Sequence, residues 1–417
     1  MSTGVPDSGR LRSVDEHLAV VLDGVGSIEP IELTLVDSQG LLLAEDVSAA
    51  FSLPSFDNSA MDGYAVRAVD TRDASRDKPA QLRVVGDIAA GAKARSGMGP
   101  GLAMRIMTGA PIPAGADAVI PLEDTDRGLA RVAIHRPVQS GECMRRTGED
   151  LQAGAPALGA GAVVGPQQIG LLAALGRERV LVRPRPRVVV LSTGSELVDV
   201  GARPAFGEVI DSNSYMIAAA AKDAGADIYR VGIVADDHAT LLDTLENQLL
   251  RADVLVTSGG VSMGAYDVVK EALTDLGTVE FVRVAMQPGK PQGFGHVGDK
   301  VPIFCLPGNP VSSLVSFEAF VRPAIRKLLG KRILQRTTVE ATALESVTSP
   351  RGVRQYRRGV LQRESTGGYS VDFVGGPGSH LLAALAMANC LVVLDENTTE
   401  VAAGSLVTVM PLLLSNR

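Results

Sequence analysis

Four short loops rich in small and polar residues follow apolar runs in the middle of the sequence. They span residues 192–196, 235–237, 257–262 and 307–313. Glycines and hydroxyl side chains in such loops let backbone N–H groups approach a phosphate closely, and neighbouring carboxylates can hold a hard cation such as Mg²⁺. The residue types therefore favour a site for a phosphorylated, anionic ligand that is accompanied by a cation.

The glycine and proline loops also have ordinary structural interpretations. The run Thr257-Ser258-Gly259-Gly260 is as typical of a turn between a strand and a helix as of an anion-binding nest. The segment 307–313 resembles a capped helix start with structural prolines, and taken alone this is the more ordinary interpretation. Neither loop identifies a ligand by itself.

The charged candidates have two interpretations as well. Glu196, Asp236 and Asp267 follow predicted strands, where a carboxylate either caps a helix or contributes to a cation site. Lys290 stands between two prolines. A lysine is usually a solvated surface residue, but one held on a rigid loop would be positioned for a phosphate.

Regular alternation of apolar strands and amphipathic helices predicts the scaffold that carries these loops. Such alternation is typical of right-handed crossovers and a mostly parallel sheet with helices on both faces. Ligands bind beyond the carboxyl ends of these strands, so we expect the four loops to converge on one crevice. The expected strands are 187–191, 228–234, 254–256, 279–284 and 301–305, and the expected helices are 212–224, 239–250, 266–276 and about 311–329.

The remaining sequence predicts further domains. A capping box at Ser13 and Glu16 opens a helix with one apolar face. Short apolar runs separated by Gly, Pro and Asp turns predict two β regions. We therefore expect a multidomain α/β plus β chain. Its parts are a discontinuous helical and extended domain (1–55 and 142–184), an inserted β module (56–141), a central doubly wound α/β domain (185–331) and a small C-terminal β-barrel domain (332–417).

Composition excludes several function classes. The net charge of −7, the 4% aromatic content and the absence of Trp disfavour nucleic-acid binding. No apolar run approaches the roughly 20 residues that a membrane helix needs, so we expect no membrane partner. The polar first ten residues lack an export signal, and the three cysteines are far apart. These features predict a cytoplasmic protein without a disulfide framework.

Seven longer motifs occur in one order along nearly the whole chain, and together they resemble the molybdopterin molybdenumtransferase (MoeA) family. A coincidence of several long motifs in order is far more specific than one short match. The motifs are FDNSAMDGYAV (56–66), RIMTGAPIPAGADAV (105–119), RRTGED (145–150), LSTGSEL (191–197), TSGGVSMG (257–264), MQPGKP (286–291) and LPGNPVSS (306–313).

The resemblance implies a reaction and its partners. It implies that molybdate is inserted into adenylylated molybdopterin, with AMP released, Mg²⁺ required and molybdenum cofactor as the product. It also implies an elongated homodimer of four-domain subunits, with each active cleft shared between two subunits. The molybdopterin adenylyltransferase and molybdoenzyme apoproteins are further partners that such an enzyme would meet.

The resemblance also assigns roles to residues of this sequence. The implied catalytic residues are Asp62, Thr108, Glu196, Asp236 and Asp267, of which the last three would hold the metal. The implied substrate-binding residues are Asp150, Ser192, Thr193, Gly194, Ser258, Gly259, Gly260, Ser262, Lys290, Pro307, Gly308, Asn309, Pro310 and Ser312.

Two positions depart from the family pattern. Ser195 stands where the family usually has Asp, and Gln287 stands where it usually has Lys. Glu196 and Lys290 remain, so we expect an active enzyme with weaker anion binding. Two alternatives stay open: a carrier that binds the pterin without inserting metal, and an unrelated phosphotransferase on the same fold. The second lacks support, because neither a Walker-type loop nor G-x-G-x-x-G follows residue 191.

Overall fold

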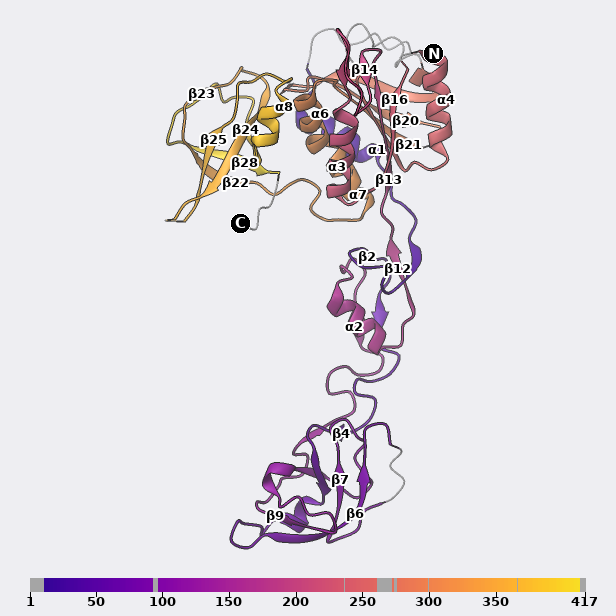
Figure 1. Cartoon of the computed structure of the whole chain (residues 1–417), viewed down its shortest axis with the longest axis vertical. Coiled ribbons are helices and arrows are strands. Elements are labelled where there is room, and N and C mark those ends of the chain that lie inside the picture. The colour runs from indigo at the N-terminus through magenta and orange to yellow at the C-terminus, as the bar shows by residue number, and fades with distance from the viewer. Residues whose placement is uncertain are drawn as a thin grey trace. The chain divides into compact units, whose positions relative to one another are not determined.

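The computed structural model describes residues 11–92, 97–235, 237–260, 272–273, 276–298, 300–365 and 367–412. The chain forms two compact units (Figure 1). The large unit comprises Met1–Ile31 with Arg183–Arg417, and the small unit is Glu32–Val182. Each unit has its own apolar core, so we describe them separately.

A six-stranded sheet forms the centre of the large unit, in the order β16-β13-β17-β21-β20-β18. The first four strands are parallel, as the alternating pattern predicts, whereas β20 and β18 form an antiparallel edge that includes a strand not predicted at 291–297. The strands are β13 (Arg187–Thr193), β16 (Asp227–Val234), β17 (Val254–Ser258), β18 (Gly277–Arg283), β20 (Pro291–Val297) and β21 (Val301–Leu306).

Helices cover this sheet close to their predicted positions. They are α3 (Asn213–Ala224), α4 (His238–Leu249), and one continuous helical segment made of α6 (Pro310–Ser316), a π-helical turn (Phe317–Val321) and α7 (Arg322–Leu328). Of the helix predicted at 266–276, residues 266–271, 274 and 275 lie outside the described residues. Within the described ranges, no helix is both long and apolar enough to cross a membrane.

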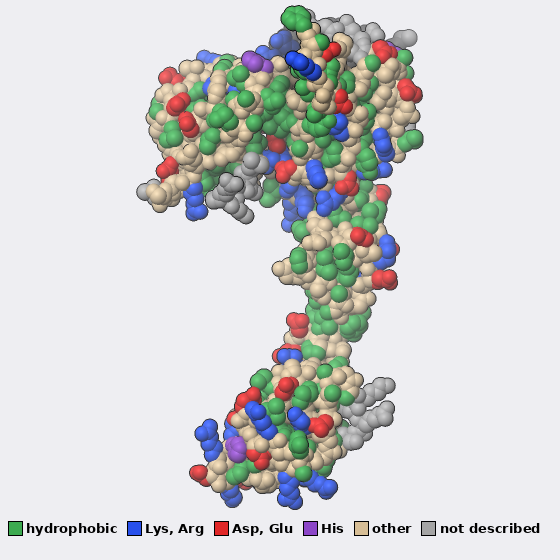
Figure 2. Space-filling view, viewed as in Figure 1, with side chains coloured by type: hydrophobic (Ala, Val, Ile, Leu, Met, Phe, Trp, Pro, Cys, Tyr) green, Lys and Arg blue, Asp and Glu red, His purple; other side chains and the backbone are tan. Residues whose placement is uncertain are grey.

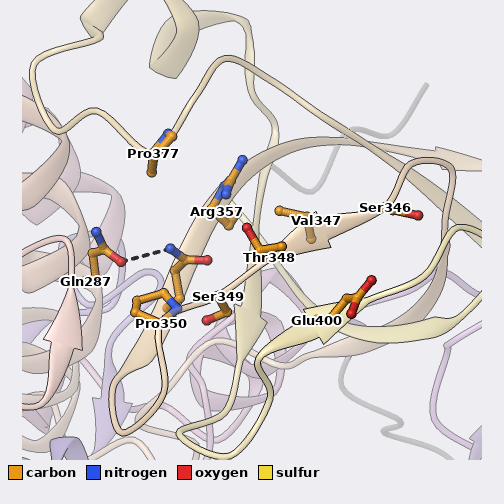
Figure 3. A pocket seen from close by; sticks show the side chains of 10 residues that line it. Gln287, Ser346, Val347, Thr348, Ser349, Pro350, Arg357, Pro377 and Glu400 are labelled. Atoms are coloured by element: carbon orange, nitrogen blue, oxygen red, sulfur yellow. Dashed lines mark hydrogen bonds between the residues drawn. The ribbon is translucent and has the colours of Figure 1, made fainter.

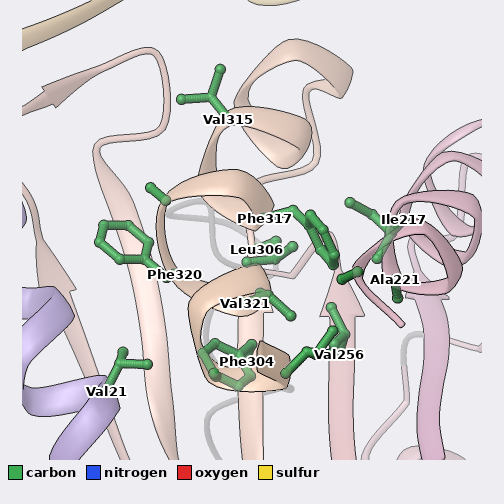
Figure 4. Packing of buried hydrophobic residues seen from close by; sticks show 14 of the residues in the cluster. Val21, Ile217, Ala221, Val256, Phe304, Leu306, Val315, Phe317, Phe320 and Val321 are labelled. Carbon is green, nitrogen blue, oxygen red and sulfur yellow. The ribbon is translucent and has the colours of Figure 1, made fainter. Parts of the chain in front are cut away.

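The first helix, α1 (Val14–Gly24), begins as predicted but packs elsewhere than expected. The Glu16 N–H donates to Ser13 Oγ at 3.1 Å, and the Ser13 N–H donates to Glu16 Oε2 at 2.8 Å, which completes the capping box. Val21 joins the core of the large unit beside Phe320 (Figure 4). The assignment of this helix to a domain of 1–55 is therefore corrected. Its apolar face covers the buried aromatic residues of the α/β core.

A buried ion cluster fixes the end of this helical segment. Glu318 is buried, and its Oε2 accepts 2.7 Å hydrogen bonds from Nε of both Arg322 and Arg336. Asp223 of α3 pairs with the same two guanidinium groups. The ion pairs of Glu318 and Asp223 with Arg322 and Arg336 tie the segment that leads out of α7 to the α/β core.

On the surface, acidic and basic side chains are interspersed over the visible face of the molecule, and Lys and Arg side chains gather near the end of α7 (Figure 2).

The C-terminal region forms the predicted small β-barrel. Its strands pair in the order β24-β25-β22-β28-β26, and β26 pairs again with β24, which closes the five-stranded barrel. They are β22 (Val339–Ala343), β24 (Arg354–Arg363), β25 (Tyr369–Phe373), β26 (Cys390–Leu394) and β28 (Leu406–Pro411). Three short elements adjoin this barrel: β23 (Val347–Thr348) paired with β27 (Glu400–Val401), and α8 (Leu382–Met387). The strand β19 (Met286–Gln287) pairs with β24 and so joins the α/β core to the barrel.

The small unit contains two regions with separate cores. One is a five-stranded sheet in the order β8-β5-β7-β6-β9, built from β5 (Gly63–Val66), β6 (Ala80–Ile88), β7 (Leu102–Ile106), β8 (Ala118–Pro121) and β9 (Arg131–Ile134). The other combines chain segments from before and after that sheet. It includes β1 (Ile31–Thr34), β2 (Leu42–Leu43), β3 (Val47–Ser48), β11 (Pro156–Leu158), α2 (Pro166–Ala174) and β12 (Arg179–Arg183). Two short strands connect these two regions in the sequence. β4 (Asn58–Ser59) stands between β3 and β5, β10 (Met144–Arg145) stands between β9 and β11, and the two pair with each other.

Candidate functional site

Three of the four predicted loops meet at one edge of the central sheet. The first strand, β13, lies between the second, β16, and the third, β17, so the chain reverses direction across the sheet beside β13. In doubly wound folds such a switch point leaves a crevice outside the strand ends. The loops after β13, β17 and β21 lie at these strand ends, and we call the region that they border the crevice.

Close backbone contact explains why glycine occupies these loops. Gly259 has φ +96°, and a Cβ added to it would lie 2.2 Å from the carbonyl oxygen of Thr193. A Cβ on Gly308 would lie 3.6 Å from Gly259 Cα, in ordinary contact. The Gly259 N–H donates to the Leu306 carbonyl at 3.1 Å. Only glycine therefore permits the observed approach of the β13 and β17 loops.

Asn213, the first residue of α3, holds two of these loops together. Its Nδ2 donates to Ser258 Oγ at 2.8 Å and to the Gly308 carbonyl at 2.7 Å. Ser258 Oγ also lies 3.4 Å from Ser313 Oγ of α6. Sequence reasoning missed Asn213. The available signal was the polar run Asp211-Ser212-Asn213 at the start of a helix that is otherwise rich in alanine.

A buried carboxylate, Asp211, holds the end of β13 through a hydrogen bond to Ser192. Asp211 is 1% exposed and accepts hydrogen bonds from Ser192 Oγ at 3.0 Å and from the N–H and hydroxyl of Ser214 at 3.1 and 2.5 Å. Ser192, expected to contact substrate, is itself buried and uses its hydroxyl on Asp211. The structure therefore gives Ser192 a positioning contact, and it adds Asp211 to the residues that sequence reasoning missed.

One exposed carboxylate and two buried, unpartnered oxygen atoms lie on the segments that border the crevice. Glu196 is exposed, and its carboxylate oxygens fold back to within 2.8 Å of where a Cβ on Gly194 would stand. Thr193 Oγ1 and Asn213 Oδ1 are buried and have no hydrogen-bond partner in the described part of the chain. Among those residues, no group of three His, Cys, Asp or Glu side chains is arranged to hold a metal. Asp236, Asp267 and Ser262 lie outside the described residues.

The remaining candidates lie on the loops after β17 and β21 or directly before β20. Gly260 is buried with φ +71°, and Pro307 and Ser312 are buried, whereas Gly308 and Asn309 are exposed. Pro310 is the first residue of α6. Asn309 Nδ2 donates to Ser379 Oγ at 2.9 Å, so this loop contacts the segment that precedes α8. Lys290 is partly exposed, and its carbonyl accepts from the Val284 N–H at 2.7 Å.

Two residues of the small unit that were predicted to be catalytic, Asp62 and Thr108, form hydrogen bonds with each other. Asp62 Oδ1 accepts from the Thr108 N–H at 2.7 Å and from Thr108 Oγ1 at 2.8 Å. These bonds, the backbone one first, lower the pKa of Asp62 from its ordinary value. Asp150 is exposed, and its N–H donates to the Leu53 carbonyl at 3.0 Å.

A second carboxylate of the small unit, Asp57, was not predicted as a site residue. Its Oδ1 accepts from the N–H and Oγ1 of Thr147, both at 2.8 Å, and its Oδ2 accepts from Arg146 Nη1 at 2.8 Å. The Thr147 N–H bond, followed by the Arg146 bond, lowers the pKa of Asp57 to about 2. Asp57 belongs to the motif at 56–66 and both partners belong to the motif at 145–150, and only the fold reveals that these two motifs pair.

Comparison with protein families matches three consecutive parts of the chain. Residues 12–176 match the MoeA N-terminal region (domains I and II), and residues 189–327 match a probable molybdopterin-binding domain. Residues 340–412 match the MoeA C-terminal region (domain IV). The second match contains the crevice, and the first contains Asp62 and Thr108.

Individual relatives agree with these family matches. The chain is 46% identical to molybdopterin molybdenumtransferase 1 of Mycobacterium tuberculosis, over 96% of this chain and 98% of that protein. It is 48% identical to molybdopterin molybdenumtransferase 2 of the same organism, over 95% and 98%. A crystal structure of a molybdopterin biosynthesis MoeA protein from Pyrococcus horikoshii superposes with a TM-score of 0.83. It is 31% identical and covers 97% of this chain and 100% of that chain.

Proposed function

Because this chain belongs to the molybdopterin molybdenumtransferase (MoeA) family, we propose that it inserts molybdate into adenylylated molybdopterin and releases AMP. The observation that carries the proposal is the close approach of Thr193, Gly259 and Gly308 at the switch point of the sheet. Three glycine-bearing or hydroxyl-bearing loops at one crevice suit a phosphorylated ligand, because their backbone groups reach it without intervening side chains.

In the proposed reaction, water attacks the phosphoanhydride bond between the pterin phosphate and AMP, and AMP leaves. The two dithiolene sulfurs replace oxygen atoms of molybdate, which leave as water. Gly259 and Gly308 would let the phosphates lie against the backbone. Asn213 would keep the two loops at a fixed spacing through its bonds to Ser258 and Gly308. Fixed donors stabilise developing charge without reorganising, which is the usual basis of phosphoryl-group catalysis.

A cation belongs to the same proposal. Glu196, with Asp236 and Asp267, would hold Mg²⁺, and the unpartnered oxygens of Thr193 and Asn213 fit the preference of Mg²⁺ for oxygen ligands. When bound, Mg²⁺ would neutralise the phosphate charge that would otherwise be repelled by these carboxylates. Glu196 is exposed beside Gly194 and is accessible for this role.

We further propose a homodimer whose active clefts are shared. Family resemblance supports a cleft that combines the α/β domain of one subunit with the β module of the other. Asp62, Thr108 and Asp150 would then face the bound substrate of the partner subunit. The molybdopterin adenylyltransferase would supply the substrate and molybdoenzyme apoproteins would receive the product, in the cytoplasm.

Reconstitution tests the proposed activity. Purified protein, adenylylated molybdopterin, molybdate and Mg²⁺ are mixed, and a molybdenum-free apoenzyme is added to report finished cofactor. Activation of the apoenzyme that requires all four components supports the proposal. Tight pterin binding without any activation would instead identify a carrier.

A further inference from the structure

A pocket of about 740 Å³ lies in the large unit, where the strand β19 meets the C-terminal barrel (Figure 3). Gln287 of β19, Gln355 and Arg357 of β24, and Ser349 after β23 are among the side chains that line it. Pockets for small organic molecules have volumes in this range and place a few polar groups within mostly apolar walls. None of the described residues that we place at the crevice lines this pocket.

Two buried polar atoms of the pocket have no partner in the described residues. Gln355 is 2% exposed, and its Nε2 donates to Gln287 Oε1 at 2.9 Å, but its Oε1 is unpartnered. Ser349 is 7% exposed, and its Oγ is unpartnered as well. Leaving a buried acceptor unpaired is unfavourable, so such atoms in a pocket indicate where a ligand supplies the missing bond.

Arg357 adds a donor group to the same pocket. Its guanidinium lies 5.7 Å from the ring centre of Phe373, and within the described ranges no carboxylate lies within 4 Å of it. Burial lowers the pKa of Arg357, with no carboxylate to offset the effect. The pocket therefore offers an unpaired amide oxygen, the unpaired hydroxyl of Ser349 and a guanidinium without an ion-pair partner among the described residues. The hydroxyls of Ser346 and Thr348 and the carboxylate of Glu400 line it as well.

These groups select a particular ligand chemistry. An oxyanion alone would place an oxygen against Gln355 Oε1 and leave that acceptor unpaired. A ring edge that carries N–H donors beside a carbonyl would satisfy Gln355 and also accept from Arg357 or Ser349. Pro350 and Pro377, which also line the pocket, provide apolar surface for a flat ring. A pterin presents such an edge at its 2-amino and 4-oxo positions.

We infer that this pocket binds the 2-amino-4-oxo edge of the pterin ring, with Gln355 Oε1 accepting from the amino group. The inference rests on the proposed function, since it places the ring of the proposed substrate. The pocket adjoins the crevice through the segment before α8. Pro377 lines the pocket, and two residues later Ser379 accepts a hydrogen bond from Asn309 at the crevice loop. The pterin ring in the pocket and the pterin phosphate at the crevice would thus contact neighbouring parts of the large unit.

Fluorescence titration of the full-length protein with pterin and with lumazine tests the inference. Lumazine carries a carbonyl where pterin carries the amino group, and this carbonyl would face Gln355 Oε1. We expect wild type to bind pterin about tenfold more tightly than lumazine, the factor that one well-placed buried hydrogen bond supports. Equal affinities for the two compounds, or no pterin binding at all, would overturn the inference.

Two variants locate the binding site. Gln355→Leu should remove the preference for pterin, and Ser349→Ala should weaken pterin binding without disturbing the Gln287–Gln355 bond. Gln362→Leu is the matched control, because Gln362 is an exposed residue of the same strand and does not line the pocket. It should bind both compounds like wild type. Unchanged pterin preference in folded Gln355→Leu would refute the site. Molybdenum insertion by wild type, assayed separately, shows whether the proposed function itself holds.

Discussion

Thr108 donates two hydrogen bonds to one oxygen of Asp62, from its backbone N–H at 2.7 Å and from Oγ1 at 2.8 Å. The two residues are 46 positions apart in the sequence, and both come from motifs that resemble the MoeA family. Both bonds favour the ionised carboxylate, so the pKa of Asp62 is lowered. Asp62 is thereby held as an anion in a fixed orientation on the surface of the small unit.

Thr108→Val should raise the pKa of Asp62 toward the ordinary value without restoring it fully. The substitution removes the Oγ1 bond but keeps the stronger contribution of the backbone N–H. The pKa of Asp62 is lower in the folded than in the unfolded protein. The ionised carboxylate therefore stabilises the fold above about pH 4, and this stabilisation is lost as the pH falls through the folded-state pKa. NMR titration of the Asp62 carboxyl measures the shift. Thr125→Val is the control, since Thr125 Oγ1 bonds to the Leu122 carbonyl. An Asp62 pKa identical to that of wild type would contradict the assignment.

Gly259→Ala should destabilise the large unit by about 2 kcal/mol or more. The residue has φ +96°, and its new Cβ would stand 2.2 Å from the Thr193 carbonyl oxygen, so the crevice loops must separate. Gly308→Ala in the next loop is the control, since its Cβ meets Gly259 Cα at an ordinary 3.6 Å. Thermal unfolding of the full chain compares the two variants. Equal midpoints for the two would show that the loops can move apart at little cost.

Much of the architecture follows from sequence because buried parallel strands are read as apolar runs, as for 187–191 and 254–256. The strand β20 was missed because Gly293 and Gly295 interrupt its pattern. Both glycines are required by packing, since a Cβ on Gly295 would lie 1.9 Å from the Thr278 carbonyl oxygen. Sequence predicted α1 itself but placed it with the wrong neighbours, because its apolar face does not identify which core it covers.

The site was predictable to a similar degree. The glycine loops could be found from residue type and position after strands. Asn213 could not, because its partners Ser258 and Gly308 are 45 and 95 positions away and only the fold brings them together. The hydrogen bond between Gln287 and Gln355 could not be predicted for the same reason. The sequence shows that Gln287 replaces the Lys usual in the family, but it does not show that the Gln355 amide donates to Gln287.

Gln287→Lys should tighten molybdate binding. An ammonium near a bound oxyanion is attracted by about 1 to 4 kcal/mol at a separation of 4 Å, and this gain should shrink as salt rises. In the structure Gln287 Oε1 accepts from Gln355 Nε2 at 2.9 Å, and the substitution removes this bond. Molybdate titrations at low and high salt measure the effect, with Ser195→Asp and the double variant for comparison. Unchanged affinity at low salt would show that residue 287 does not face the anion.

Mixing two inactive variants tests whether clefts are shared between subunits. Asp62→Ala removes a carboxylate of the small unit, and Glu196→Gln removes the charge of one in the large unit. If each cleft takes these residues from different subunits, some mixed dimers contain one intact cleft and part of the activity returns. Mass spectrometry establishes that subunits have exchanged. Exchanged dimers that remain fully inactive would contradict the shared cleft.

We propose that the crevice beside β13 couples AMP release to molybdenum insertion. The most direct measurement is a single turnover in which AMP and pterin-bound molybdenum are quantified in one sample. We predict one AMP per molybdenum inserted by wild type, and at least a tenfold loss of both in Glu196→Gln. The control Glu208→Gln should behave like wild type, because Glu208 Oε2 accepts from the Ala205 N–H in its own turn. AMP release without molybdenum insertion, or equal yields from wild type and Glu196→Gln, would contradict the account.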